Sequence, residues 1–123
     1  MKGVILSTAP ESRIVDLSHG IAPQNILEGA FFLAAAVPTF PAGTIHVAVV
    51  DPGVGTTRRP VIARCAGQFV VFPDNGLLTL LERTHPFEAS VVIENSALMA
   101  ASPSATFHGR DIFAPAAAHL SLG

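Results

Sequence analysis

The chain has 123 residues, of which half are hydrophobic and 13% are charged, and its net charge is −2. This length supports one domain with a core, and the weak, scattered charge excludes nucleic acid and anionic membranes as partners. No apolar run reaches the about 18 residues of a membrane span, and the one cysteine excludes an internal disulfide. We therefore expect a cytoplasmic protein, part of whose apolar surface is covered by a partner or a further domain.

The first two expected elements are the end of a helix and a strand. Residues 1–8 are typical of the last turns of a helix, and because no cap precedes the apolar residues we expect the chain to be truncated before Met1. Residues 12–17, SRIVDL, predict a short buried strand. A polar cluster follows, so we expect His19 at the carboxyl end of that strand.

A helix and a second strand come next. Over residues 26–37, apolar side chains recur at three- and four-residue spacing after a capping Asn25, which predicts the clearest helix of the chain. Residues 45–50 are rich in β-branched side chains and predict a buried strand that ends at Asp51. Strand, helix and strand form a βαβ unit, whose strands should pair in parallel. We therefore predict an α/β fold with a mostly parallel central sheet flanked by helices, and Asp51 at the edge where ligands bind.

The loop after Asp51 is the strongest candidate for chemistry. Pro52 and two glycines stop the strand, and Arg58 or Arg59 can fold back over the carboxylate in bidentate geometry. An Asp-Pro-Gly turn is also common chain punctuation, and an Asp at a strand end is more often a cap or turn residue than a catalyst. The glycine spacing does not match a dinucleotide-binding loop or a phosphate loop.

The rest of the chain predicts short elements joined by turns. In chain order we expect a hairpin, a turn that contains Asn75, a short helix, a strand, a polar stretch and a last helix, at residues 60–72, 73–76, 77–83, 88–94, 96–105 and 112–120. Cys65 in the hairpin is expected to be a buried small hydrophobe. Asp111 lies near the positive end of the last helix. Because no strand follows to cover that helix, we expect a truncation after Gly123 as well.

Three motifs occur in a fixed order along the chain. They are DPGVGTTR at 51–58, PDNGLL at 73–78 and TFHGRDIFAP at 106–115. With these motifs the chain resembles the S-adenosylmethionine hydroxide adenosyltransferase family over nearly its whole length. That family shares a fold with the S-adenosylmethionine-dependent fluorinase and chlorinase. The resemblance implies that residues 1–123 are the amino-terminal α/β domain of this fold, without its carboxyl-terminal β-barrel domain.

The resemblance implies a hydrolase that splits S-adenosylmethionine with water into adenosine and L-methionine. By motif, its catalytic residues are Asp51, Arg58 and His108. Asp51 and His108 would orient or deprotonate the water, while Arg58 would hold the Asp51 carboxylate by opposite charge. Phe107 would offer an apolar face to adenosine. The substrate-binding residues that the resemblance implies are Gln24, Val54, Asn75, Thr106 and Phe107.

Several alternatives stay open. Halogenases resemble this chain but carry a non-acidic residue where Asp51 stands and, in the fluorinase, a serine where Gly109 stands; a carboxylate at the site would repel halide, so hydrolysis is the preferred interpretation. The chain also lacks the family's amino-terminal Thr-Asp-Phe-Gly type motif, which leaves a non-catalytic fragment as a third reading. Outside the family motif, His108 would more often be a hydrogen bonder at a helix start, and Phe107 part of the core.

The resemblance also implies partners. The full-length protein would be a homotrimer with its S-adenosylmethionine sites between subunits, and this substrate is the only small molecule expected. The five histidines are spread singly, without a pair at the spacing of zinc sites, so no metal and no cofactor is expected.

Overall fold

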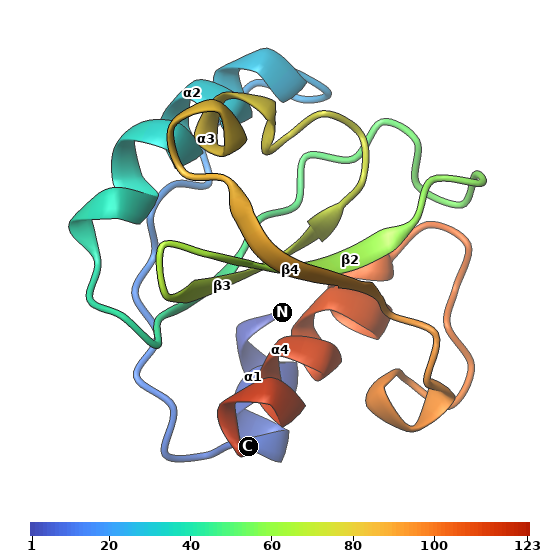
Figure 1. The fold of residues 1–123 in the computed structure, drawn as a ribbon. Helices are drawn as coiled ribbons and strands as arrows, with labels where there is room; N and C mark the ends of the chain where they lie inside the picture. The colour runs from blue at the N-terminus through green and yellow to red at the C-terminus, as the bar shows by residue number, and fades with distance from the viewer.

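In the computed structural model, which describes residues 1–123, a four-stranded sheet lies between two pairs of helices (Figure 1). The helices α2 and α3 cover one face of the sheet and α1 and α4 cover the other. The strands are β1 (Ile45–Val47), β2 (Pro60–Cys65), β3 (Gln68–Pro73) and β4 (Phe87–Val92). The helices are α1 (Lys2–Thr8), α2 (Ile26–Ala36), α3 (Thr79–Thr84) and α4 (Ala114–Ser121), with short turns η1 (Val37–Thr39), η2 (Ser96–Leu98) and η3 (Gly109–Phe113). The predicted α/β class is confirmed.

The sheet is mixed, with strand order β1-β3-β2-β4. β1 runs parallel to β3, with Ile45 opposite Phe69, whereas β2 is antiparallel to both of its neighbours. The prediction of a mostly parallel sheet is therefore wrong. The reason is the two-residue turn between β2 and β3, where Ala66 and Gly67 both have positive φ (52° and 69°) and make the tight hairpin that only antiparallel strands form.

Residues 12–17 do not form the predicted strand. They join no ladder, and Val15 is 61% exposed. The Asp16 carboxylate accepts hydrogen bonds from the side chains of Lys2 and His19 instead. The predicted parallel pairing of this segment with residues 45–50 is also wrong, because the one strand partner of β1 is β3. His19 therefore follows a segment without regular secondary structure rather than a strand.

The other predicted elements are present with small shifts in their bounds. Asn25 caps α2, because its Oδ1 accepts a hydrogen bond from the backbone N–H of Glu28 at 3.0 Å. The predicted hairpin forms, and Cys65 within it is completely buried. The strand that ends before Asp51 is shorter than predicted, at three residues. The last helix begins with the π-helical turn η3, which the sequence pattern did not predict.

Two apolar cores fill the two sides of the sheet. Alternate residues of β3 divide between them: Val70 and Phe72 pack with α2 and α3, and Val71 packs with η3 and α4 on the other face. Gly29 lets α2 approach the segments that follow β3 and β1, since a Cβ there would lie 2.8 Å from Leu77 Cδ1 and 3.1 Å from Val50 Cγ2. This contact brings the start of α2 over the end of β1, where the predicted site lies.

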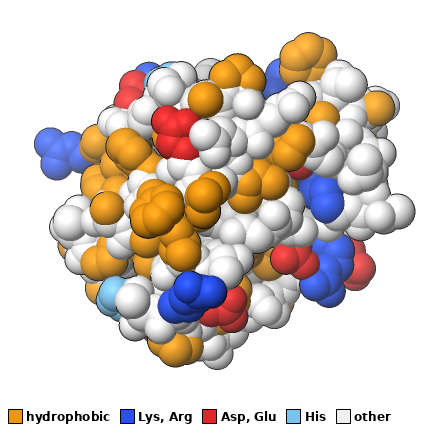
Figure 2. All heavy atoms as spheres, turned by 90° about the horizontal axis from the view of Figure 1, so that it is seen from above, with side chains coloured by type: hydrophobic (Ala, Val, Ile, Leu, Met, Phe, Trp, Pro, Cys, Tyr) orange, Lys and Arg blue, Asp and Glu red, His pale blue; other side chains and the backbone are white.

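The outer face of α2 is apolar. Leu27 and Phe31, one turn apart, are 62% and 63% exposed, and Phe32 is 40% exposed. Figure 2, which views the molecule from the side of α2 and α3, shows hydrophobic side chains gathered on this face. Such a face agrees with the expected cover by a partner or a further domain, which stays a prediction. No helix has the length and apolar character that are needed to cross a membrane.

Candidate active site

The candidate site lies at the edge of the sheet where β1 and β3 both end. Because these two strands are parallel, their carboxyl ends meet, and the loops that follow carry Asp51 and Asn75. Asn75 ties the two loops together: its Nδ2 donates to the Val50 carbonyl at 2.9 Å and its Oδ1 accepts from the Leu77 N–H at 3.2 Å. Asn75 thus holds the chain next to Asp51 in place.

Asp51 and Arg58 form a buried ion pair across the loop that joins them. Arg58 Nε lies 2.9 Å from each carboxylate oxygen, and Nη2 donates to Oδ2 as well. The side chains are 8% (Arg58) and 4% (Asp51) exposed, and the guanidinium carbon lies 5.4 Å from the centre of the Phe113 ring. The predicted fold-back of an arginine over the carboxylate is observed. Val54, an expected substrate-binding residue, donates its N–H to the Asp51 carbonyl at 3.2 Å.

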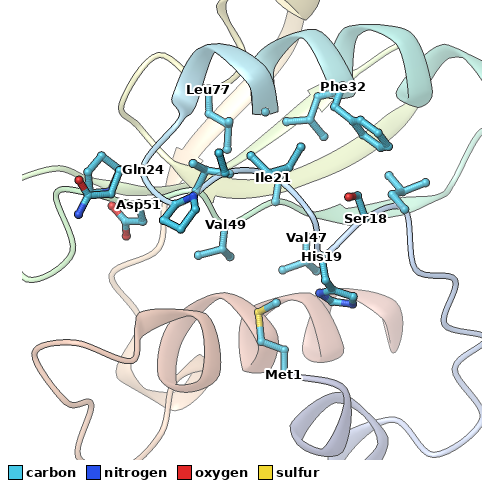
Figure 3. Close-up of a pocket in the computed structure, with 18 residues that line it drawn as sticks. Met1, Ser18, His19, Ile21, Gln24, Phe32, Val47, Val49, Asp51 and Leu77 are labelled. Carbon is cyan, nitrogen blue, oxygen red and sulfur yellow. The ribbon is translucent and has the colours of Figure 1, made fainter.

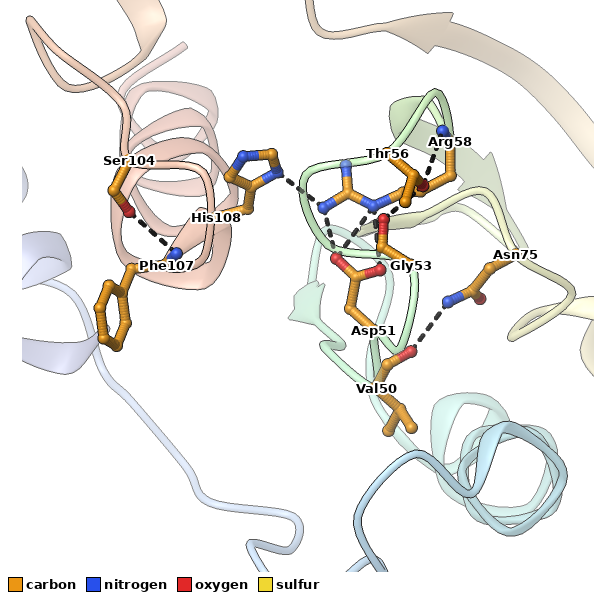
Figure 4. Close-up of polar contacts among 9 residues, drawn as sticks. All are labelled: Val50, Asp51, Gly53, Thr56, Arg58, Asn75, Ser104, Phe107 and His108. Carbon is orange, nitrogen blue, oxygen red and sulfur yellow. Dashed lines mark hydrogen bonds and ion pairs between the residues drawn. The ribbon is translucent and has the colours of Figure 1, made fainter.

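His108 joins this pair from the far end of the chain. Arg58 Nη2 lies 2.7 Å from His108 Nδ1 (Figure 4). Because a guanidinium N–H can only donate, we assign Nδ1 as the acceptor and place the ring proton on Nε2. The three residues expected from the family motifs, Asp51, Arg58 and His108, are therefore in direct contact through Arg58.

Two loops meet at the site through their backbones. Gly55 has φ +78°, and a Cβ at this position would lie 2.5 Å from the Ala105 carbonyl oxygen. Thr106 and Phe107 follow Ala105, and both are exposed; Phe107 is 59% exposed. Its ring points away from Asp51 (Figure 4) and lies against Arg110 instead, 5.0 Å from the guanidinium carbon. The structure thus brings His108, but not the Phe107 ring, toward Asp51.

A largely apolar cavity of about 360 Å³ opens beside Asp51. Its volume is in the range of small-molecule pockets. Asp51 and Gln24 lie at one end and Ser18 and His19 at the other, with Val49 between them (Figure 3). Gln24 adopts a positive φ of 66°, which is uncommon for a residue other than glycine. The predicted substrate-binding residue Gln24 therefore lines the same cavity as the predicted catalytic Asp51.

Metal ligands do not gather in the structure, which has no group of three or more His, Cys, Asp or Glu side chains suited to hold an ion. The polar groups of the site are an aspartate, an arginine, a neutral histidine and amides. This set suits the binding and activation of water or of a polar ligand.

Comparison with protein families agrees with the motifs. Residues 1–123 match the family described as the SAM hydroxide adenosyltransferase N-terminal domain. The chain belongs to this family. The resemblance that the three motifs indicated is thereby confirmed.

Relatives of this SAM hydroxide adenosyltransferase N-terminal domain include two kinds of enzyme. An (R)-S-adenosyl-L-methionine hydrolase from Salinispora arenicola is 46% identical over 122 residues, which are 98% of this chain and 46% of that protein. A fluorinase from an Actinoplanes species is 29% identical over 145 residues, 99% of this chain and 49% of that protein. The chain spans about half the length of the curated relatives that it matches.

The fold is also similar to that of a solved protein. A crystal structure of an uncharacterized conserved protein from Thermotoga maritima has a TM-score of 0.96 and 41% sequence identity to this chain. The match covers 99% of this chain and 48% of that protein.

Sequence reasoning missed the residues that hold the loops of this SAM hydroxide adenosyltransferase domain. The contact of Gly55 with Ala105 joins two loops that are far apart in the sequence. The hydrogen bond from the Ser104 N–H to Asp111 starts in a polar stretch that has no periodicity. The glycine of a Gly-Thr-Thr turn is a weak signal for a close approach. No sequence signal points to Ser104.

Proposed function

We propose that the full-length protein hydrolyses S-adenosyl-L-methionine to adenosine and L-methionine. The observation that carries this proposal is the contact of Asp51, Arg58 and His108, of which Asp51 lines a cavity of small-molecule size. The 46% identity to a protein named (R)-S-adenosyl-L-methionine hydrolase supports the same reaction. The substrate is expected in the cavity, against Gln24.

The chemistry asks for a positioned nucleophile rather than an acid. A water oxygen attacks the ribose 5′ carbon, the bond from that carbon to the sulfonium sulfur breaks, and methionine leaves as a neutral thioether that needs no proton. The water loses one proton to a base. The rate therefore depends on how the water is held, oriented and relieved of that proton.

Asp51 and His108 divide these tasks. Arg58 donates two hydrogen bonds to Asp51 Oδ2 and one to Asp51 Oδ1. Oδ1 therefore keeps acceptor capacity for a proton of the water. His108 carries its proton on Nε2 and can donate to the water oxygen, since its Nδ1 is taken by Arg58. We therefore assign proton acceptance to Asp51 and orientation to His108. No metal or cofactor is needed for this step.

A halogenase is the second candidate, because the fluorinase from Actinoplanes matches 99% of the chain. In that reaction a halide takes the place of water. The Asp51 carboxylate would repel a halide in a site that is removed from solvent. Hydrolysis is therefore the preferred function.

The family also supports proposals on assembly and location. We propose a homotrimer with its sites between subunits, and the apolar outer face of α2 is available for such an interface. We propose a cytoplasmic location, where S-adenosyl-L-methionine is available.

The product of the reaction tests the proposal. The full-length protein is incubated with S-adenosyl-L-methionine and a chelator, with chloride or without halide, and the nucleoside is identified by mass spectrometry. Adenosine in every condition supports hydrolysis without metal. A 5′-halogenated adenosine would contradict it and identify the protein as a halogenase. No turnover, with a stable fold and full length, would leave a non-catalytic module.

A further inference from the structure

A buried carboxylate that follows His108 in the chain, that of Asp111, has no role in the proposed reaction. Asp111 lies on the π-helical turn η3 and is 3% exposed. Its Oδ2 accepts the backbone N–H of Ser104 at 2.8 Å, and its carbonyl accepts the N–H of Ala100 at 2.8 Å. Its own N–H donates to the Phe107 carbonyl at 2.9 Å. One residue thus fastens three points of the loop that precedes His108.

Arg110 completes this anchor. Its Nε and Nη2 donate to the two carboxylate oxygens of Asp111 at 2.6 and 3.0 Å. The Arg110 guanidinium beside Asp111 holds the pKa of that carboxyl well below its usual range, so the carboxyl stays charged at neutral pH. The other side of the guanidinium faces the Phe107 ring. Ser104 adds a second tie, because its Oγ accepts the Phe107 N–H at 2.9 Å.

The anchored loop leads directly into the candidate site. Ala105, between the tied residues, presses its carbonyl against Gly55 of the first loop. His108 follows Phe107 and reaches Arg58 with Nδ1. The hydrogen bonds of the Asp111 side chain go to Ser104 and Arg110, and none of them goes to the catalytic residues expected from the motifs. The loop therefore connects the Asp111 carboxylate to His108.

We propose that Asp111 is a positioning residue: its carboxylate, paired with Arg110, holds residues 104–107 so that His108 Nδ1 meets Arg58. The effect on turnover rests on the proposed hydrolysis. The effect on His108 does not, because the tautomer and contact of the ring exist without any substrate. The two consequences are therefore measured separately.

The first test is ¹⁵N NMR of the His108 ring in the full-length protein. In the wild type we expect one tautomer, with Nε2 protonated and Nδ1 unprotonated. Asp111→Asn places an NH₂ group against the donors of Ser104 and Arg110, so the loop loses its anchor and the two ring nitrogens should shift toward their averaged values. The matched control is Asp74→Asn, which breaks the exposed pair between Arg59 and Asp74 and should leave the His108 spectrum unchanged.

The second test is steady-state hydrolysis of S-adenosyl-L-methionine. Because a displaced reacting group costs rate rather than binding, Asp111→Asn should lower kcat about 10-fold or more, with KM changed by no more than about 2-fold. Asp74→Asn should keep both constants. If the wild type has no turnover, the proposed function fails and the NMR test alone decides the role of Asp111.

A folded Asp111→Asn protein with the wild-type His108 spectrum would overturn the proposal. If Asp111→Asn does not fold, milder variants decide. Ser104→Ala removes the tie to the Phe107 N–H and keeps the backbone N–H bond to Asp111, and Arg110→Gln removes the bidentate pair from an exposed position. A few-fold lower kcat or a shifted His108 spectrum in either variant supports the anchor. Wild-type values of both in the two variants would overturn it.

Discussion

Arg58 and Arg59 are neighbours in the chain, and each pairs with an aspartate, but the two pairs lie in opposite environments. The side chains of Arg58 and Asp51 are 8% and 4% exposed, whereas those of Arg59 and Asp74 are 66% and 42% exposed. An exposed pair contributes about 0–1 kcal/mol to stability. A buried pair must offset the desolvation of both charges, and it is weak evidence for a stabilising role. Burial, rather than residue type, therefore separates the pair expected to act in chemistry from the pair at the surface.

Asp51→Asn is expected to have the largest effect on the rate of hydrolysis. If it had no effect, the buried pair would not differ in function from the exposed one. The change keeps the size of the side chain but removes the charge and the proton acceptor. Hydrolysis of S-adenosyl-L-methionine by the full-length protein should slow by about 10²-fold or more. Binding, measured by calorimetry, should change little. A variant with wild-type turnover would remove Asp51 from the mechanism.

Gly55→Ala sharpens the comparison, because it displaces the loop of the buried pair without changing either charge. The new Cβ would meet the Ala105 carbonyl oxygen, and φ is positive at this position. We expect a loss of about 1–3 kcal/mol in the free energy of unfolding, together with lower activity. Gly43→Ala is the matched control: its φ is +84°, but nothing lies within 4 Å of its Cβ. Equal losses of activity in both variants would argue against the loop contact.

His46 and Gln68 form a third polar pair, which is buried like Asp51 and Arg58 but carries no charge. It tests whether burial also sets the contribution of an uncharged pair to stability. His46 Nε2 lies 2.7 Å from Gln68 Oε1, and burial lowers the pKa of His46 below its ordinary value of 6.5. The unfolded chain therefore binds a proton more readily than the folded protein. Stability should be complete above pH 6.5 and should fall as the pH drops from there toward the lowered pKa.

Urea unfolding at several pH values measures this effect. His46→Gln should reduce the loss of stability in mild acid. The control His119→Asn changes an exposed histidine and should keep the wild-type pH dependence. A wild-type slope in His46→Gln would contradict the assignment of the effect to His46.

Asp74→Asn is expected to have the smallest effect. It removes the charge from an exposed pair whose Nη2 to Oδ2 distance is 2.6 Å. The free energy of unfolding should change by no more than about 1 kcal/mol, and hydrolysis should be unchanged. A large loss of activity would mean that the exposed pair also supports the site, since Asp74 is next to Asn75.

The sequence predicted the elements whose signals are local. The helix from Ile26 has apolar residues at three- and four-residue spacing and an asparagine cap, and the hairpin has a two-residue turn, so neighbouring residues specify both. The motifs also named Asp51, Arg58 and His108, which the structure places in contact. The resemblance to the family supplied this prediction, because it assigns a role to each residue of a motif, which the fold class alone does not.

Only the tertiary structure decided which strands pair and what holds the site. Residues 12–17 have the pattern of a strand, but a strand forms only with a partner, and β1 pairs with β3 instead. The π-helical turn, the anchor at Asp111 and the contact of Gly55 with Ala105 likewise depend on segments that meet in space. Local patterns describe one segment at a time, whereas hydrogen bonds between distant segments are set by how the whole chain packs.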